Sequence, residues 1–232
     1  IRPYSYRWKP CYGFKAYGVC MPSGFQVHGI DVSHYQGNID WKMLTQTRQG
    51  KFPIHFVFMK ASEGGDYGDK AFITNFDSAK THGFIRGAYH FYNPKTDPIR
   101  QADFFINSVK LDSGDLPPVL DIEKRGKDEN QLRRDLKLWL DKIEQHYKVK
   151  PILYTSYKFK TRYLNDSVFN SYPYWIAHYY VDSVRYEGKW HFWQHTDVGT
   201  VPGIEEEVDL NVFNGTMEEL LELTLKTPCI ER

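Results

Sequence analysis

The chain has 232 residues, of which 41% are hydrophobic and 25% charged, so it can bury one substantial core. Its 30 basic and 29 acidic side chains give a formal net charge of +1, which provides no global field to attract nucleic acid or an anionic membrane. The chain contains no run of 18 apolar residues, so no integral membrane segment is expected.

Residues 1–27 are predicted to form an N-terminal extension, because proline and glycine interrupt them and no apolar period persists. The chain opens with Ile1 and lacks the charged and then apolar start of a signal peptide, so we expect a processed chain. Cys11 and Cys20 lie in this extension, and Cys229 stands near the other end. A disulfide that closes a small loop is favoured over a zinc site, and it would indicate an oxidising compartment. One thiol is then left over, and the sequence does not decide which.

From residue 28 onward, short apolar runs alternate with helical patterns, as expected of βα units around a parallel sheet. The clearest helical pattern covers 129–147, where Leu132, Leu136 and Trp139 recur at steps of three and four residues. The apolar runs predicted as strands are 27–32, 54–60, 85–92, 118–123, 151–156, 174–179, 190–195 and 207–213. The helices predicted between the earlier strands are 40–49, 69–82, 97–109, 129–147 and a shorter one near 160–170.

Helical patterns disappear before the last three strands, and glycine and proline mark turns there instead of crossovers. The sequence therefore predicts an α/β fold: a TIM-like irregular barrel of eight strands with about five helices, whose last strands are linked without crossover helices. Residues 28–232 are predicted to form one catalytic barrel domain, with residues 216–226 as a helix packed outside it. We expect the chain to act as a monomer.

The strongest local signal for chemistry is the segment 117–123, which ends in Asp121-Ile122-Glu123. Residues i and i+2 of a strand share a face, so the two carboxylates are expected to project together at the end of a barrel strand. Two carboxylates in a partly dry site cannot both ionise freely, so one pKa should rise and that group can donate a proton. Glycoside hydrolysis needs such a donor. A solvated acidic pair or two ligands of a divalent metal are the alternatives.

Two further acids strengthen this interpretation. Asp31 stands near the end of the first predicted strand, and Asp209 stands on the last. The first and last strands of a closed barrel are neighbours, so these two side chains should face one another. Taken singly, Asp31 could be a cap and Asp209 a surface acid; together with Asp121 and Glu123 they predict four acids at one mouth.

A series of short motifs in this chain resembles glycoside hydrolase family 25, over about residues 28–214. These motifs are Gly29-Ile30-Asp31-Val32-Ser33 with Gln36, Lys60-Ala61-Ser62-Glu63-Gly64, Gly87-Ala88-Tyr89-His90-Phe91, Asp121-Ile122-Glu123, Trp175-Ile176-Ala177, Trp193-Gln194 and Val208-Asp209. Members of that family are lysozymes that cut the β-1,4 bond after N-acetylmuramic acid. Each motif is weak alone, but their common order and spacing make the resemblance specific.

The resemblance implies that Glu123 is the general acid/base and that Asp121 stabilises the 2-acetamido group of the substrate. The carbonyl oxygen of that group would attack the anomeric carbon in place of a protein nucleophile. Asp31 and Asp209 would support the floor of the site. The implied substrate-binding residues are Tyr89, Tyr154, Trp175, Trp193, Gln194 and Glu63, although packing in the core is an alternative for each aromatic ring.

The chain departs from the family pattern at two positions. His195 follows Trp193-Gln194 where tyrosine is frequent, and Ser62 stands where threonine is frequent. His195 would change the pH response if it lay in the cleft. Residues 191 and 195 are too far apart on a strand to share an ion, so no metal and no cofactor are expected.

We therefore expect a secreted or cell-envelope N-acetylmuramidase whose partner is the glycan of peptidoglycan. An aromatic content of 16% is consistent with sugar binding. A chitinase-like N-acetylglucosaminidase and a non-catalytic glycan-binding module on the same fold are the alternatives. Retention of all four acids argues against a module that only binds.

Overall fold

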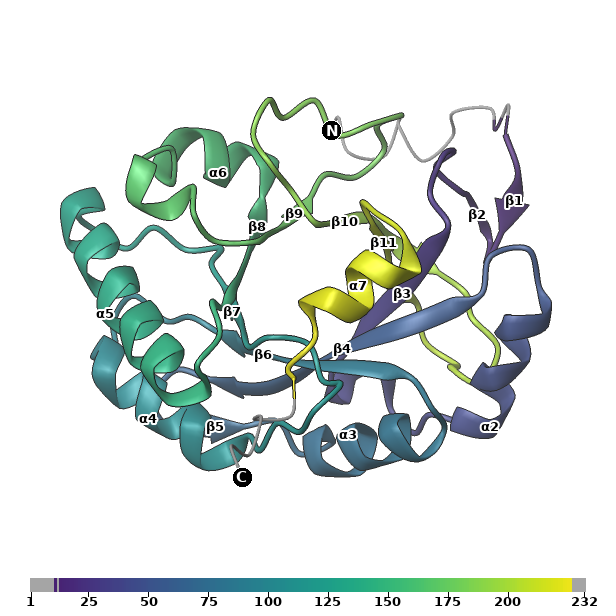
Figure 1. Ribbon diagram of the computed structural model, residues 1–232, viewed down its shortest axis with the longest axis horizontal. Coiled ribbons are helices and arrows are strands. Elements are labelled where there is room, and N and C mark those ends of the chain that lie inside the picture. Colours follow the sequence, from purple (N-terminus) through teal and green to yellow (C-terminus); the bar gives the residue numbers. More distant parts are fainter. Residues whose placement is uncertain (1–10, 12, 227–232) are drawn as a thin grey trace, which may run out of the picture.

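The computed structural model describes Cys11 and residues 13–226, and eight of their strands close into a barrel (Figure 1). The strands follow the order β3-β11-β10-β9-β8-β7-β6-β4, and pairing of β3 with β4 closes the ring. Their bounds are β3 Val27–Val32, β4 Ile54–Glu63, β6 Ile85–Phe91, β7 Val119–Asp121, β8 Ile152–Ser156, β9 Tyr174–Ala177, β10 Phe192–Gly199 and β11 Val208–Phe213. The predicted irregular TIM-like barrel is thus confirmed.

The last strand breaks the parallel pattern. Neighbouring strands from β3 through β10 are parallel, whereas β11 is antiparallel to both β10 and β3. A short strand β5 (Tyr67–Gly68) pairs with the end of β4. No helix connects β9 to β10 or β10 to β11, as the turn signals predicted.

Six α-helices surround the described barrel, and most coincide with the predicted ones. They are α2 (Trp41–Leu44), α3 (Phe72–Thr81), α4 (Pro98–Ser108), α5 (Glu129–Tyr147), α6 (Tyr157–Tyr163) and α7 (Met217–Leu223). A 3-10 helix, Thr45–Gln49, continues α2. The helix predicted near 160–170 was placed too late. The Ser156 side chain accepts a hydrogen bond from the Phe159 amide, so α6 begins as soon as β8 ends, and only a 3-10 turn, Ser167–Phe169, follows.

Two apolar layers hold these elements together. The outer layer lies between the strands and the helices, and it includes the buried face of α5. The inner layer fills the barrel with rings from alternate strand positions, among them Phe56, Phe58, Trp175 and Phe192. A Cβ atom on Gly29 would lie 2.3 Å from the Phe56 ring, so glycine is required where that ring crosses β3.

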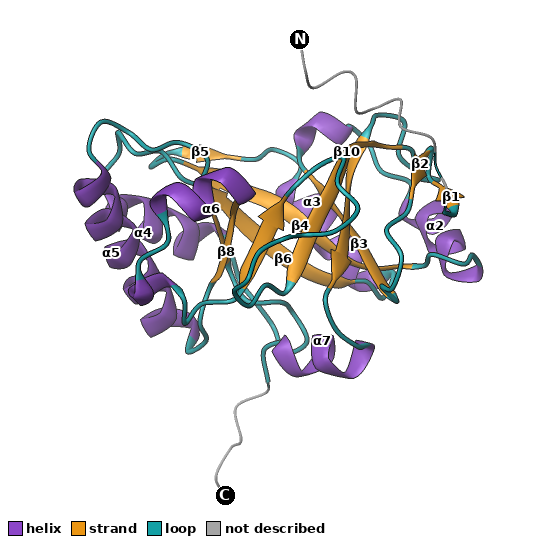
Figure 2. Cartoon of the chain, turned by 90° about the horizontal axis from the view of Figure 1, so that it is seen from above, coloured by secondary structure: helices purple, strands orange, loops and turns teal. Residues whose placement is uncertain are grey.

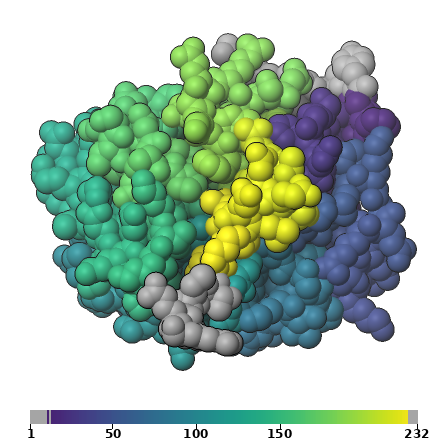
Figure 3. Space-filling view, viewed as in Figure 1, coloured from purple at the N-terminus to yellow at the C-terminus, as the bar shows by residue number. Residues whose placement is uncertain are grey.

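Helix α7 closes one end of the barrel. Leu220, on α7, is fully buried and belongs to the inner apolar layer. Figure 2 shows α7 beneath the barrel, at the opposite end from β5. In Figure 3 the same helix, in yellow, covers the middle of the viewed face. The open end of the barrel is therefore the one at which the parallel strands finish, which is where β5 pairs with β4.

The N-terminal extension carries structure of its own. Strands β1 (Lys15–Ala16) and β2 (Val19–Cys20) pair as a short hairpin, and a disulfide joins Cys11 to Cys20. Tyr17 ties the hairpin to the barrel: its hydroxyl donates to the Phe52 carbonyl, and its own carbonyl accepts from the Thr200 amide. Cys229 lies outside the described residues.

Candidate functional site

Three of the four predicted acids lie on strands that meet at the open end of the barrel. Asp31 is on β3 and Asp121 is the last residue of β7. Asp209 lies near the start of β11, which runs in the opposite direction, so it reaches the same end. Asp31 and Asp209 are direct cross-strand partners, as the closed barrel predicted.

Amide side chains fix the position of the Asp31 carboxylate. Gln194 Nε2 donates to Asp31 Oδ2 at 2.8 Å, and Asn211 Nδ2 donates to the same oxygen at 2.7 Å. Both donors stand on neighbouring barrel strands, β10 and β11. The side chain of Asp31 is buried, so these two bonds replace the water that it loses.

Aromatic side chains orient the two amides in turn. The hydroxyls of Tyr154 and Tyr179 donate to Gln194 Oε1 at 2.6 and 2.5 Å. Trp175 Nε1 donates to Asn211 Oδ1 at 2.7 Å. Because each amide oxygen accepts from a ring, each amide nitrogen is left to donate to Asp31. The floor of the mouth is thus a continuous hydrogen-bonded network.

The pKa values of Asp31 and Asp209 are both raised. Burial is the main cause for each, and the negative charge of Asp31 raises the pKa of Asp209 further. The hydrogen bonds from Asn211 and Gln194 lower the pKa of Asp31, because they favour its charged form, and so they oppose the effect of burial. The facing pair therefore tends to share a proton, with the charge on Asp31 and the proton on Asp209.

Asp121 is a buried acid with a carboxyl oxygen that is unsatisfied within the described residues. Its side chain is buried, and among the described residues none supplies a hydrogen bond to Oδ1. Burial raises the pKa of Asp121 well above its ordinary value, and the charges of Glu123 and Asp31 raise it further. A buried acceptor without a partner is costly, and a ligand that donates to it removes that cost.

Glu123 lies at the rim of the mouth, beyond the end of β7. The predicted strand 118–123 was too long, since β7 ends at Asp121 and Glu123 belongs to the exposed segment that follows. Nearby protein still desolvates its carboxyl in part, which raises its pKa, while Lys124 and Lys60 act in the opposite direction. Its charge raises the pKa values of Asp31, Asp121 and Asp209. Glu123 is therefore electrostatically part of the acidic group although it reaches solvent.

An ion pair borders this group on β4. Lys60 Nζ lies 2.7 Å from Glu63 Oε2, and the lysine is buried while the glutamate is partly exposed. The positive charge of Lys60 lowers the pKa values of Asp121 and Glu123, whereas Glu63 raises that of Asp121. Glu63 thus borders the site as the ion-pair partner of Lys60. In the sequence, Lys60 stood out only as part of a motif.

Tyr89 lies among the acids. Tyr89 on β6 lies opposite Lys60 on the neighbouring strand β4, and its ring packs edge-on against Trp175. The pKa of the Tyr89 hydroxyl is raised well above its ordinary value by burial and by the charges of Asp31, Asp121 and Asp209. The ring remains partly exposed, so it can face a ligand at the mouth.

The two tryptophans predicted to face sugar have other positions. Trp175 is fully buried, stacked on Phe58 with ring centroids 4.4 Å apart, so it supports Asn211 from below. Trp193 stands on the outer face of β10, where it packs against Phe25 and donates to the His178 carbonyl. Adjacent strand residues point in opposite directions, so Gln194 and Trp193 cannot both enter the barrel.

His195 also lies on the outer face of β10, and not in the cleft. Burial lowers the pKa of its imidazole to about 3, so the ring is neutral at physiological pH. The pH effect expected of His195 in the cleft therefore has no structural basis. Within the described residues, no three His, Cys, Asp or Glu side chains gather closely enough to hold a metal ion, and no helix there is long and apolar enough to cross a bilayer.

Sequence reasoning missed Asn211, Tyr179 and Lys60 as parts of the site. Asn211 follows Asp209 by two residues and shares its face, so strand alternation could have found it. Tyr179 lies beyond the end of β9, where no periodic pattern shows its direction.

The facing acids predict how stability changes with pH. Their pKa values are raised by folding, so the stabilising effect of their protonated forms is complete below about pH 4 and is lost as the pH rises. We expect Asp209→Asn to raise the Tm by about 2–4 °C at pH 8, equivalent to about 1 kcal/mol for a chain of this length, and to change it little at pH 4. Thermal unfolding followed by circular dichroism measures this change in Tm.

Asp66→Asn, at an exposed position, is the control for this measurement. An equal shift in Tm for both variants, or a larger shift at pH 4 than at pH 8, would contradict the assignment.

Comparisons with known proteins agree with this fold. The family model described as Glycosyl hydrolases family 25 matches residues 30–204. The uncharacterized protein YegX of Escherichia coli K12 is 41% identical over 214 residues, which cover 90% of this chain and 78% of the relative. Lysozyme M1 of Streptomyces globisporus is 34% identical over 222 residues, covering 87% and 72%. A solved family 25 glycosyl hydrolase from Bacillus anthracis superposes with a TM-score of 0.79 at 32% identity, covering 87% of this chain and 94% of the other.

Proposed function

Because the chain belongs to glycosyl hydrolases family 25 and is a glycoside hydrolase, we propose that it cuts the β-1,4 bond between N-acetylmuramic acid and N-acetylglucosamine in peptidoglycan. The observation that carries this proposal is the electrostatic interaction of Glu123, whose pKa is raised, with Asp121, whose buried Oδ1 has no hydrogen-bond partner among the described residues. The relatives named lysozyme support the choice of substrate.

Glu123 is the general acid of the first step. A raised pKa increases the protonated fraction of its carboxyl at a given pH, and its place at the rim lets it reach the glycosidic oxygen of a bound strand. It gives its proton to that oxygen as the bond to the anomeric carbon breaks, and the bonding electron pair leaves with the N-acetylglucosamine hydroxyl. In the second step the ionised Glu123 takes a proton from water.

Asp121 stabilises the acetamido group that acts as nucleophile. The N–H of that group is a donor of the kind that Asp121 Oδ1 lacks, and the carbonyl oxygen attacks the anomeric carbon to form a cyclic oxazolinium ion. The positive charge that develops there favours the carboxylate form of Asp121. Attack by water from the same side as the departed sugar then returns the original anomeric configuration, so the reaction retains stereochemistry.

The remaining polar groups hold the reacting pair in place. Asp31, fixed by Gln194 and Asn211, keeps negative charge beneath the site, and Lys60 moderates the repulsion between Asp121 and Glu123. Tyr89 offers a partly exposed ring at the mouth. Peptidoglycan lies outside the cytoplasmic membrane, so we propose that the protein acts in the cell envelope or after secretion.

Mass spectrometry of digested cell walls tests the bond, and NMR of the fresh products tests the stereochemistry. We expect products with N-acetylmuramic acid at the reducing end, and the first product resolved by NMR should be the β-anomer. Products with N-acetylglucosamine at the reducing end would contradict the proposed bond. An α-anomer would contradict acetamido participation, and hydrolysis of chitin oligomers at an equal rate would contradict the choice of peptidoglycan.

A further inference from the structure

A cavity lies between the N-terminal extension and the outer face of β10. It has a volume of about 680 Å³, which is within the range that holds small ligands. One wall is the hairpin with the Cys11–Cys20 disulfide, and the other is formed by Trp193, His195 and Thr196 of β10. None of the four acids at the barrel mouth lines this cavity.

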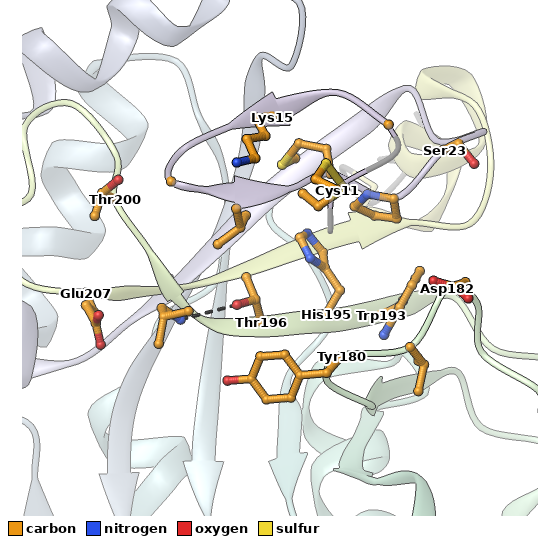
Figure 4. A pocket seen from close by; sticks show the side chains of 18 residues that line it. Cys11, Lys15, Ser23, Tyr180, Asp182, Trp193, His195, Thr196, Thr200 and Glu207 are labelled. Atoms are coloured by element: carbon orange, nitrogen blue, oxygen red, sulfur yellow. Dashed lines mark hydrogen bonds between the residues drawn. A yellow bond between two sulfur atoms is a disulfide. The ribbon is translucent and has the colours of Figure 1, made fainter. Parts of the chain in front are cut away.

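His195 lines this cavity as a nearly fully buried polar side chain. The side chain is only 6% exposed, and no described residue supplies a hydrogen bond to its Nε2 atom. Figure 4 shows the His195 ring rising from β10 toward the disulfide. Because the ring is neutral, each of its nitrogens can act as donor or acceptor according to the tautomer.

Charged side chains of both signs line the same cavity. Lys15 stands on the hairpin, and Asp182 and Glu207 stand on the loops that follow β9 and precede β11. All three are exposed, so they can meet a charged ligand without prior burial. Apolar groups from Met21, Val19 and the disulfide complete the walls. This combination suits a ligand that carries a carboxylate, an ammonium group and a backbone of amides, which a neutral sugar lacks.

Consecutive residues connect the cavity to the barrel mouth. On β10, Gln194 points inward to Asp31 while His195 points outward to the cavity. After β9, the Tyr179 hydroxyl bonds Gln194 in the mouth, while Tyr180, with a φ of 58°, lines the cavity and bonds Asp197. One strand therefore separates the two sites.

We propose that this cavity binds the peptide branch carried by the muramic acid residue of the substrate, with His195 accepting or donating to a peptide amide and Lys15 pairing with a peptide carboxylate. This assignment rests on the proposed function, since it places the branch beside the glycan that the acids cut. Asp182 and Glu207 attract the ammonium group of a diamino acid in the branch. The extension thus contributes specificity for glycan that still carries its peptides.

Binding of the free branch tests the cavity without requiring catalysis. The probe is the synthetic peptide L-alanyl-γ-D-glutamyl-meso-diaminopimelyl-D-alanine, titrated into the intact protein by calorimetry. We expect His195→Phe to weaken binding about tenfold, as for one buried hydrogen bond, and Lys15→Ala to weaken it about threefold, as for one exposed ion pair. Lys42→Ala removes an equivalent exposed lysine from α2, outside the cavity, and should leave binding unchanged.

Kinetics on two substrates separate this proposal from the proposed function. Glycan with its peptides and glycan stripped by an amidase are compared for the wild type and Lys15→Ala. We expect Lys15→Ala to raise KM about threefold on the peptide-bearing glycan only, with kcat unchanged on both. Equal KM values for both substrates in the wild type, with no peptide binding at millimolar concentration, would overturn the cavity assignment and leave the muramidase intact. No cleavage of either glycan would overturn the proposed function, and peptide titration would still decide the cavity.

Discussion

Replacement of Glu123 by glutamine is expected to lower kcat on purified cell walls by about 10²–10⁴, the usual contribution of a positioned acid/base. Glutamine keeps the size of the side chain but has no proton that it can transfer. KM should change little, because the rim position of Glu123 contributes mainly to the transition state. Release of reducing sugar gives both constants.

A substrate with an acidic leaving group sharpens this test. The aryl group of an activated muramyl glycoside leaves as a stable aryloxide and needs no protonation. The Glu123→Gln variant should therefore recover much of the rate of the first step on this substrate. Glu222→Gln, an exposed glutamate on α7 at the other end of the barrel, is the matched control and should retain full activity. A loss of less than tenfold for Glu123→Gln on cell walls would remove Glu123 from the role of general acid.

Replacement of Asp121 by asparagine is expected to lower kcat by about 10²–10³, as when one preorganised electrostatic contact is lost. Asparagine occupies the same space and still offers an oxygen acceptor, but it brings no negative charge to the oxazolinium ion. The KM for cell walls should stay within a few-fold of the wild type because the ground-state hydrogen bond survives.

The stability of the same variant shows whether the loss is catalytic. Burial and the charge of Glu123 disfavour the ionised Asp121, so asparagine should leave the Tm at pH 7 unchanged or higher. A fall in Tm together with the loss of activity would mean that Asp121 holds the fold. Full activity in the folded variant would contradict participation of the acetamido group through Asp121.

The strand ends were predictable because burial and alternation leave strong patterns. Val27–Val32 was found with both bounds correct, and the facing of Asp31 and Asp209 followed from barrel closure alone. Helix α5 was equally clear, since an apolar stripe marks it. Each of these features depends on residues close together in sequence or on a general rule of closed sheets.

The details of the site were less predictable, because they depend on which face of a strand enters the barrel and on loop conformation. Trp193 was assigned to the sugar alongside Gln194, although neighbouring positions on a strand must diverge. The conformation that directs Tyr179 inward and Tyr180 outward depends on a positive φ at Tyr180, which no local motif signals. The hairpin in the extension was likewise hidden, since each of its strands has only two residues.

The rings of Phe56, Phe58 and Trp175 fill the barrel beneath Asp31, and Leu220 of α7 seals the far end. No polymer can pass through such a solid centre. On the proposed function, a glycan strand must therefore approach Asp121 from the open end, and both products must leave by that same end.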